Sequence, residues 1–196
     1  MRFVDIGPIV LSQYNNKNIS ISNQHGSSLK FQIPRMYMPF GVSGFKPQFG
    51  NTKWNIDFSM KGYDEDGSYV NKFYNFVLDI EEKIVKHVYE NSVDIFGTQL
   101  SFDELKNMFN SNIKLNGNYE PKFRVKYDKT IVFDVNDNEC TPDEVSDGDF
   151  RQHSGVGCVE VSSVYFLNKM FGVTWKLTQL KVFEPQRLHG FMFKDV

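Results

Sequence analysis

Cysteine is scarce in this sequence, which has only Cys140 and Cys158 among its 196 residues. Two cysteines are too few for a disulfide framework, so they indicate a reducing compartment and leave room for one pair at most. Long apolar runs are also missing, since none approaches the ~18 to 20 residues of a membrane span. Asp5 and Pro8 interrupt the apolar stretch at the N-terminus, which excludes a signal peptide. We therefore expect an intracellular protein that is not secreted and has no membrane as a partner.

An excess of charge of either sign is missing too. The chain carries 22 basic and 24 acidic residues, a net charge of −2, so any site for a polyanion must come from local clustering of bases. The length predicts one domain over residues 1–196 rather than two small ones. Within it we expect residues 1–27 to form an N-terminal strand pair or extension. Residues 134–149 are rich in Asp and Glu and contain no Lys or Arg, which predicts an acidic mobile loop.

The motifs of common enzyme and metal sites are absent as well. There is no C-x-x-C, H-E-x-x-H, G-x-S-x-G or P-loop sequence, and the histidines lie far apart. Residues 134–145 imitate a calcium loop only at its start, because Glu139 replaces the required glycine and Val145 occupies the position of the bidentate glutamate. We therefore predict no enzyme activity, no cofactor and no metal ion. An enzyme with an unmarked active site ranks last among the functions considered.

Apolar and polar residues alternate over several runs, as they do in half-buried β-strands. The runs cover residues 9–14, 18–22, 29–33, 54–60, 121–127, 156–167 and 171–183. Apolar residues at helical spacing predict one long amphipathic helix over residues 70–90, and Ser101 with Glu104 forms a capping box for a short helix ending near Phe109. The apolar positions change parity near residues 178–179, which predicts a β-bulge that lets the sheet curl into a small barrel. The fold class is therefore mainly β with an inserted helix (α+β).

Residues 29–49 combine aromatic, basic and proline residues in one segment. Pro34, Pro39 and Pro47 exclude a helix and interrupt a sheet ladder because proline has no N–H, so we expect an edge or a crossing loop. Flat rings beside fixed positive charges suit unpaired nucleotides, whose bases stack on the rings while their phosphates meet Lys and Arg. A proline-rich loop folded over a hydrophobic core explains the same composition equally well.

A second basic feature lies in the run 121–127, where Lys122, Arg124 and Lys126 alternate with apolar residues. Side chains at this spacing project to one side of a strand about 6 to 7 Å apart, close to the phosphate spacing of an extended single strand. The alternative is the ordinary charged face of a solvated sheet. Trp54 and Trp175 stand at the alternating apolar positions of their own strands and are expected in the core.

Several stretches of the sequence, taken in order, resemble one known family. They read FQIPRMYMPFGVSGF, WNIDFSMKG, NSVDIFGTQLSFDEL, YEPKFRVKYD and FGVTWKLTQLKVF. The more distinctive marks are Pro39-Phe40-Gly41 and the W-x-x-x-Q pattern of residues 175–179. This order resembles the single-stranded DNA-binding proteins of large nucleocytoplasmic DNA viruses, which are distantly similar to the OB-fold single-stranded DNA-binding proteins of tailed phages. The resemblance covers roughly residues 28–193.

The resemblance implies an OB-fold-like small antiparallel β-barrel with one long amphipathic helix and one short helix. It implies a protein that coats single-stranded DNA without sequence preference in viral DNA replication and recombination, with no catalysis and no metal. The implied partners are single-stranded DNA and replication proteins. The expected location is the host cytoplasm or nucleus, at viral replication sites. The protein is expected to be either a monomer or a homodimer. The phage relatives end in an acidic tail that closes on an aromatic residue, whereas residues 191–196 here read FMFKDV. We hypothesise that the acidic loop at 134–149 replaces that tail and competes with DNA for the basic strand.

We predict sequence-independent binding of single-stranded DNA by a basic and aromatic groove. The expected phosphate contacts are Arg35, Lys46, Lys53, Lys122, Arg124 and Lys126, and the expected stacking rings are Tyr37, Phe40, Phe45 and Phe49. The alternative is a structural or scaffold protein, of a virion for example, whose proline and aromatic segment docks a protein partner.

Overall fold

The computed structural model describes residues 1–185. Its strands are β1 Val10–Leu11, β2 Asn18–Ser22, β3 Leu29–Gln32, β4 Met36–Met38, β5 Val42–Phe45, β6 Lys53–Ser59, β7 Phe109–Asn110, β8 Ile113–Lys114, β9 Lys122–Phe133, β10 His153–Leu167 and β11 Met170–Phe183. Its helical segments are the 3-10 turn η1 Phe3–Asp5 and the helices α1 Tyr69–Glu90, α2 Ser92–Phe96 and α3 Phe102–Met108. The sequence pattern predicted α1 and α3 but not α2.

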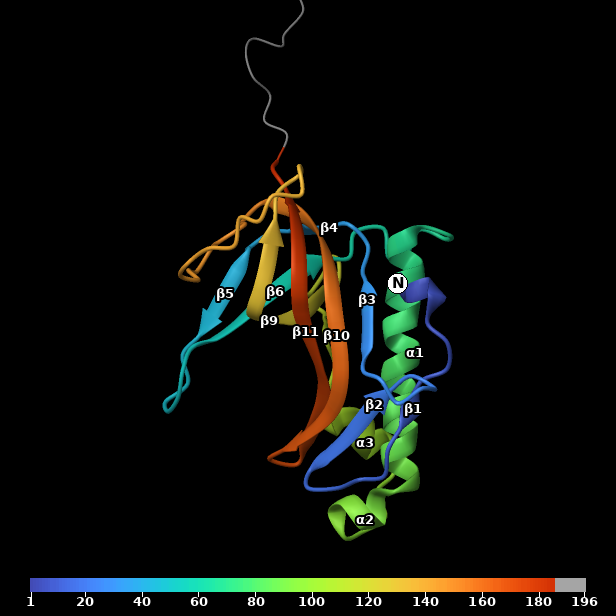
Figure 1. Ribbon diagram of the computed structural model, residues 1–196. Helices are drawn as coiled ribbons and strands as arrows, with labels where there is room; N and C mark the ends of the chain where they lie inside the picture. The colour runs from blue at the N-terminus through green and yellow to red at the C-terminus, as the bar shows by residue number, and fades with distance from the viewer. Residues whose placement is uncertain (186–196) are drawn as a thin grey trace, which may run out of the picture.

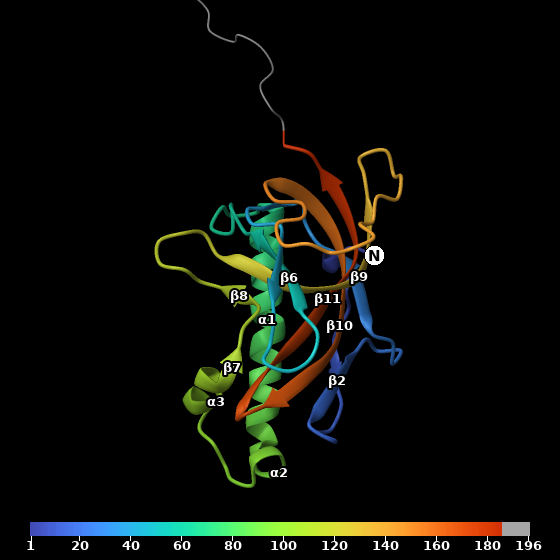
Figure 2. The ribbon, with the colours of Figure 1, turned by 90° about the vertical axis from the view of Figure 1, so that its left-hand side faces the viewer.

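The central strands close into a barrel in the order β4, β6, β9, β11, β10 and back to β4. All of these neighbours are antiparallel except β9 and β11, which run parallel with Lys126 beside Lys176. The helix α1 lies lengthwise beside the sheet in both ribbon views (Figures 1 and 2). The predicted mainly β fold, a small barrel with one long helix and one short helix, is therefore confirmed.

The barrel core is built from aromatic rings that meet at steep angles. Trp175 on β11 is 1% exposed, and its ring centroid lies 5.1 Å from that of Phe123 and 5.9 Å from that of Phe31. Phe73 on α1 packs edge-on against Phe123 at 5.0 Å, which joins the helix to the barrel. Such edge-to-face pairs are favoured by the quadrupoles of the rings. Trp175 is a core residue as predicted, whereas Trp54 is only half-buried.

Both predicted helices begin at side-chain caps. The Ser68 hydroxyl accepts a hydrogen bond from the Asn71 backbone N–H at the start of α1. Ser101 accepts one from the N–H of Glu104, whose carboxylate in turn accepts one from the N–H of Ser101. Each cap satisfies N–H groups that have no partner within the helix, which is why these positions are recognisable in the sequence.

The hairpin of β10 and β11 contains the predicted bulge. Cys158 lies opposite Gln179, but the next residue, Val159, lies opposite Leu177, so Thr178 is the extra residue. The Thr178 hydroxyl donates a hydrogen bond of 2.9 Å to the carbonyl of Cys158. This irregularity increases local twist and helps the long hairpin wrap around the barrel.

The expectation of an edge or a crossing loop in this segment is met only in part, because β5 is an edge strand that pairs with β6 alone but β4 lies inside the barrel, between β10 and β6. Met36–Met38 is the barrel strand β4, and Val42–Phe45 is the strand β5, which pairs with β6 to form a hairpin, the β5–β6 arm, that extends from the barrel (Figure 1). The three prolines lie outside the strands: Pro34 between β3 and β4, Pro39 between β4 and β5, and Pro47 between β5 and β6. The prolines therefore remove no ladder hydrogen bond, and the segment can alternate short strands with turns.

The acidic stretch 134–149 first turns back against the end of β9, where the Cys140 N–H donates to the carbonyl of Val132, and only its last residues lie along the edge of β5. The N–H of Gly44 donates to the Asp147 carboxylate at 3.0 Å, and the N–H of Val42 donates to the carbonyl of Asp149 at 2.8 Å. Asp137 pairs with Lys181 on β11 at 2.6 Å. Within residues 1–185 these carboxylates form no ion pair with the basic residues of β9, so competition between the loop and DNA stays a hypothesis.

Candidate nucleic-acid interface

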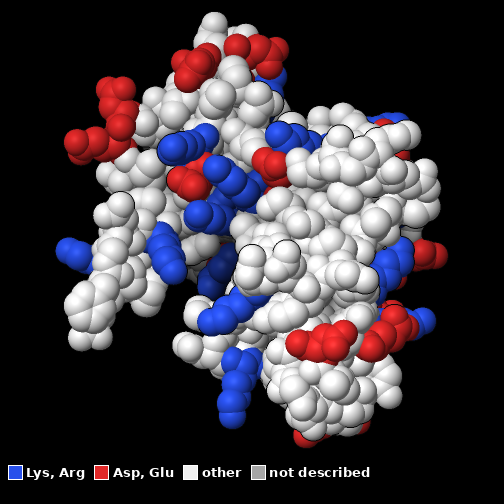
Figure 3. Space-filling model, turned by 60° about the horizontal axis from the view of Figure 1, so that its bottom comes forward, with Lys and Arg blue, Asp and Glu red and all other residues white. Residues whose placement is uncertain are grey.

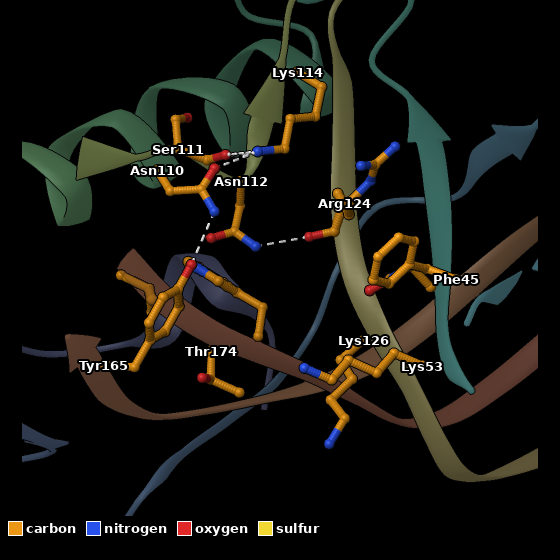
Figure 4. Close-up of a pocket in the computed structure, with 13 residues that line it drawn as sticks. Phe45, Lys53, Asn110, Ser111, Asn112, Lys114, Arg124, Lys126, Tyr165 and Thr174 are labelled. Atoms are coloured by element: carbon orange, nitrogen blue, oxygen red, sulfur yellow. Dashed lines mark hydrogen bonds between the residues drawn. The ribbon is translucent and has the colours of Figure 1, made fainter. Parts of the chain in front are cut away.

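A groove opens where the parallel pairing of β9 and β11 begins. β11 pairs with β7 at Phe171 and Gly172, and it pairs with β9 only from Lys176 onward, which leaves residues 173–175 between two partners. On the opposite side, β8 pairs with the start of β9. The resulting hollow, here called the basic groove, has a volume of about 440 Å³ (Figure 4).

Four of the residues predicted from the sequence line this basic groove, namely Phe45, Lys53, Arg124 and Lys126. The structure adds polar residues that the sequence analysis missed, which are Asn55, Asn110, Ser111, Asn112, Lys114, Tyr165 and Thr174. Most of the missed residues lie around the short strands β7 and β8 or on the β10–β11 hairpin. Strands of two residues have no alternation to detect, so no signal in the sequence placed Asn110 or Lys114 beside the basic strand.

Arg124 is not a free cation, because it is paired across the sheet with a carboxylate. Asp57 lies opposite Arg124 in the β6–β9 ladder, and the guanidinium donates two hydrogen bonds, of 2.7 and 2.8 Å, to its two oxygens. Hydrogen bonding to Asp57 raises the pKa of Arg124, while burial opposes that shift. The paired geometry orients the guanidinium but offsets much of its attraction for a phosphate.

Lys126 shares an acidic neighbour with the adjacent strand. Its ammonium lies 3.3 Å from the carboxylate of Asp128, which is also 3.6 Å from that of Lys176 on β11. Burial alone would raise the pKa of Asp128. The hydrogen bond from Lys126 and the positive charges of Lys126 and Lys176 outweigh burial, so the pKa of Asp128 is lowered. Two lysines around one carboxylate leave an excess of positive charge at this end of the basic groove.

Lys114 supplies positive charge from the other wall. Its ammonium donates a hydrogen bond of 2.8 Å to the side-chain oxygen of Asn110 and another to the carbonyl of Ser111. Burial and the charge of Arg124 lower the pKa of Lys114, and the nearby carboxylates of Glu81 and Asp57 counteract that shift. Lys114 faces the groove together with Arg124, as Figure 4 shows.

A buried carboxylate on α1 holds this wall in place. Glu81 is 6% exposed and accepts hydrogen bonds from the Ser111 hydroxyl at 2.8 Å and from the Asn112 backbone N–H at 2.9 Å. Burial raises the pKa of the Glu81 carboxyl, although these two hydrogen bonds oppose the shift. The β7–β8 connection is therefore fastened to the long helix rather than free to move away from β9.

The remaining predicted residues lie outside the basic groove. Lys122 continues the row on β9, and its ammonium lies 4.6 Å from the centre of the Phe40 ring, a cation–π contact. Arg35 lies 3.9 Å over the Phe183 ring and donates a hydrogen bond to the Ser154 hydroxyl. Arg35 and Tyr37 line a separate hollow near the start of β9.

All four predicted stacking rings are solvent-exposed, unlike the rings of the core. Tyr37 is 44% exposed, Phe40 47%, Phe45 63% and Phe49 84%. Phe49 and Lys46 belong to the loop between β5 and β6, so neither contributes to the wall of the basic groove. These rings are therefore accessible to a ligand, although a single exposed ring does not by itself mark a binding site.

Basic side chains gather visibly on the surface. Figure 3 shows Lys and Arg following one another across one face around a hollow, while most Asp and Glu lie nearer the edges of that face. Among residues 1–185 no group of His, Cys, Asp and Glu is arranged to hold a metal ion. In the same part of the chain, no helix has the length and apolarity needed to cross a membrane.

A protein-family model, described as a family of unknown function (DUF5871), matches residues 68–194. The chain belongs to this family. The matched region of this DUF5871 chain begins at the cap of α1 and includes β7 to β11, which contribute most of the basic groove. No curated protein matches the sequence.

Two solved structures share the fold of this DUF5871 chain at low sequence identity. The single-stranded DNA-binding protein gp2.5 of bacteriophage T7 has a TM-score of 0.51 and 12% identity, with 85% of this chain and 92% of that chain covered. The single-stranded DNA-binding protein of bacteriophage Enc34, in complex with single-stranded DNA, has a TM-score of 0.53 and 11% identity, with 93% and 98% covered. The predicted OB-fold-like architecture is therefore confirmed at the level of the fold.

Proposed function

We propose that this protein binds single-stranded DNA without sequence preference, along a track formed by the basic groove and the row of β9. The observation that carries the proposal is the combination of lysines on both walls of the groove with exposed rings beside them. Lys114 and Lys126 face the groove from opposite walls, and Phe45 lies at its rim. Duplex DNA has its bases stacked inside, so exposed rings favour a single strand.

The track continues beyond the groove through Lys122 and Phe40. Lys122, Arg124 and Lys126 project from the same face of β9 at two-residue spacing, about 6 to 7 Å apart. Phosphates of an extended strand follow one another at a similar distance. Arg35, Tyr37, Lys46 and Phe49 flank this track from the neighbouring hollow and from the β5–β6 arm, and we propose them as peripheral contacts.

The fold comparisons support this function without assigning residues. Both neighbours are single-stranded DNA-binding proteins by description, and one was solved with single-stranded DNA. The resemblance of the sequence to single-stranded DNA-binding proteins of large nucleocytoplasmic DNA viruses points the same way. We propose accordingly a role in viral-type DNA replication or recombination, with no catalytic step.

The decisive experiment is a titration of fluorescently labelled oligonucleotides with the full chain. We expect single-stranded DNA to bind far more tightly than a duplex of the same length at ~50 mM salt, and its affinity to fall steeply as salt increases. Equal affinity for both, or no binding of either, contradicts the proposal.

The exposed ring of Phe49, 84% exposed at the end of the β5–β6 arm, favours one alternative. A structural or scaffold protein would use the arm to dock a protein partner. Such a protein forms a stable complex with its partner that does not change when oligonucleotide is added. A DNA-binding protein instead co-purifies with nucleic acid, which raises the ratio of absorbance at 260 nm to that at 280 nm.

A further inference from the structure

We propose that one end of the basic groove is a base-reading pocket that favours thymine, cytosine and guanine, which carry a ring carbonyl, over adenine, which has none. This inference rests on the proposed binding of single-stranded DNA. It adds a preference at one nucleotide position to binding that is otherwise independent of sequence. The pocket consists of Asn110, Asn112, Lys114, Tyr165 and Thr174, which Figure 4 shows together around one side of the groove.

The hydroxyl of Tyr165 is oriented as a donor by a short chain of hydrogen bonds. Lys114 has only N–H donors and donates one at 2.8 Å to the side-chain oxygen of Asn110, which fixes the orientation of that amide. The Asn110 nitrogen then donates at 2.8 Å to the oxygen of Tyr165. A hydroxyl that accepts this bond keeps its own proton free to donate elsewhere. Within residues 1–185 no acceptor takes that proton.

The amide of Asn112 is oriented as an acceptor. Its nitrogen donates a hydrogen bond of 2.8 Å to the carbonyl of Arg124, so its oxygen points the other way. No donor within residues 1–185 reaches that oxygen. The backbone of Asn112 is held by Glu81, and its side chain by β9, so the position of the oxygen is set before any ligand arrives.

Donors outnumber acceptors among the groups that remain free. The Tyr165 hydroxyl, the third proton of the Lys114 ammonium and the Thr174 hydroxyl can all donate, while the Asn112 oxygen is the fixed acceptor. A base with a carbonyl oxygen offers an acceptor to these donors, and thymine, cytosine and guanine all carry one. Thymine and guanine also have a ring N–H beside that carbonyl that can donate to the Asn112 oxygen, whereas cytosine can use only its amino group, farther along the same edge. Adenine offers only ring nitrogens as acceptors, so the donors would find weaker partners.

The test compares oligo(dT) with oligo(dA) for the wild type and for Tyr165→Phe. Free oligo(dA) stacks on itself, but that cost is the same for both proteins, so the change in the affinity ratio isolates the hydroxyl. We expect the wild-type preference for dT over dA to fall on the order of three- to ten-fold in Tyr165→Phe, the range for one hydrogen bond. The salt dependence should stay unchanged, because no charge is removed.

Two further variants make the test specific. Thr174→Val removes a second donor of the same pocket with little change of shape, and it should also reduce the preference. Tyr119→Phe is the matched control, because Tyr119 is 75% exposed and lies outside the groove. A dT-to-dA ratio that is the same in wild type, Tyr165→Phe and Thr174→Val overturns the base-reading pocket while DNA binding stands. Failure of the wild type to bind either oligonucleotide overturns the proposed function itself.

Discussion

Asp57 on β6 holds Arg124 on β9 by two hydrogen bonds, of 2.7 and 2.8 Å, directly across the sheet. The pair attaches a carboxylate to Arg124, a lining residue of the basic groove, so a phosphate bound there would compete with Asp57 for the same guanidinium. DNA that binds here therefore meets a cation whose charge is already partly compensated. The pair also links two neighbouring barrel strands, so the same contact affects stability and binding in opposite directions.

Asp57→Asn should strengthen binding of single-stranded DNA. Without the carboxylate, Arg124 is free to contact a phosphate, and the slope of log K against log salt should become steeper by about 0.7, the value for one phosphate on a single strand. Titrations at several salt concentrations measure both quantities. Asp94→Asn on α2 is the control and should change neither. Weaker binding by a folded Asp57→Asn protein would argue that Asp57 positions Arg124 for DNA rather than competing with it.

Lys53→Ala should weaken binding and flatten its salt dependence. Lys53 lines the basic groove and forms no ion pair within residues 1–185, so its full charge is available to a phosphate. We expect the salt slope to decrease by about 0.7. Lys83→Ala, on the exposed surface of α1, removes the same charge away from the groove and serves as the control. An equal loss in both variants would indicate attraction by overall charge instead of a defined track.

Phe45→Ala should cost more affinity than Phe49→Ala. Phe45 lies at the rim of the basic groove, where a base can stack on it, and such contacts contribute about 1 to 3 kcal/mol per base. Phe49 lies farther out on the arm, so we expect a smaller loss. Both rings are exposed, so melting temperatures should stay near that of the wild type. The opposite order of effects would place the DNA along the arm rather than in the groove.

Glu81 should make stability depend on pH. Its pKa is raised in the folded protein by burial, so the folded state prefers the protonated form more than the unfolded state does. The stability that this preference contributes is present below the unfolded pKa and is lost as pH rises through the folded pKa. The melting temperature of the wild type, relative to that of Glu81→Gln, should therefore increase as pH falls from 7 to 4.

The neighbouring residue provides the control for this pH dependence. Glu82 follows Glu81 on α1 but is exposed, so Glu82→Gln should keep the pH profile of the wild type. If Glu81→Gln also kept the wild-type profile, the hydrogen bonds from Ser111 and Asn112 would have cancelled the effect of burial on the carboxyl.

The sequence predicted the elements whose signals are local. Residues 69–90 repeat apolar positions at helical spacing, Ser101 and Glu104 sit at a cap, and the parity change at Thr178 marks a real bulge. Each of these depends on neighbours within a few residues. The alternation of β9 likewise placed Lys122, Arg124 and Lys126 on one face, and their role in binding stays a prediction.

The rest of the site depends on contacts between distant segments. The pairing of Asp57 with Arg124 requires the register of β6 and β9, and the position of Asn112 requires a hydrogen bond to Glu81 on α1. Neither the register of β6 and β9 nor the hydrogen bond between Asn112 and Glu81 can be recognised from a local sequence pattern. The short strand β4 was missed for a related reason, since a strand of three residues is too short to show alternation.

The inserted helices separate the two halves of the groove by a long stretch of chain. β6 precedes α1, whereas β9 and β11 follow α3, so the walls meet only when the barrel closes through pairings between distant residues. Closure of this kind needs contacts between residues far apart in the sequence, so the groove exists only in the folded barrel. Single-stranded DNA should consequently bind the native state alone, and saturating oligonucleotide should raise the melting temperature in proportion to the logarithm of its concentration.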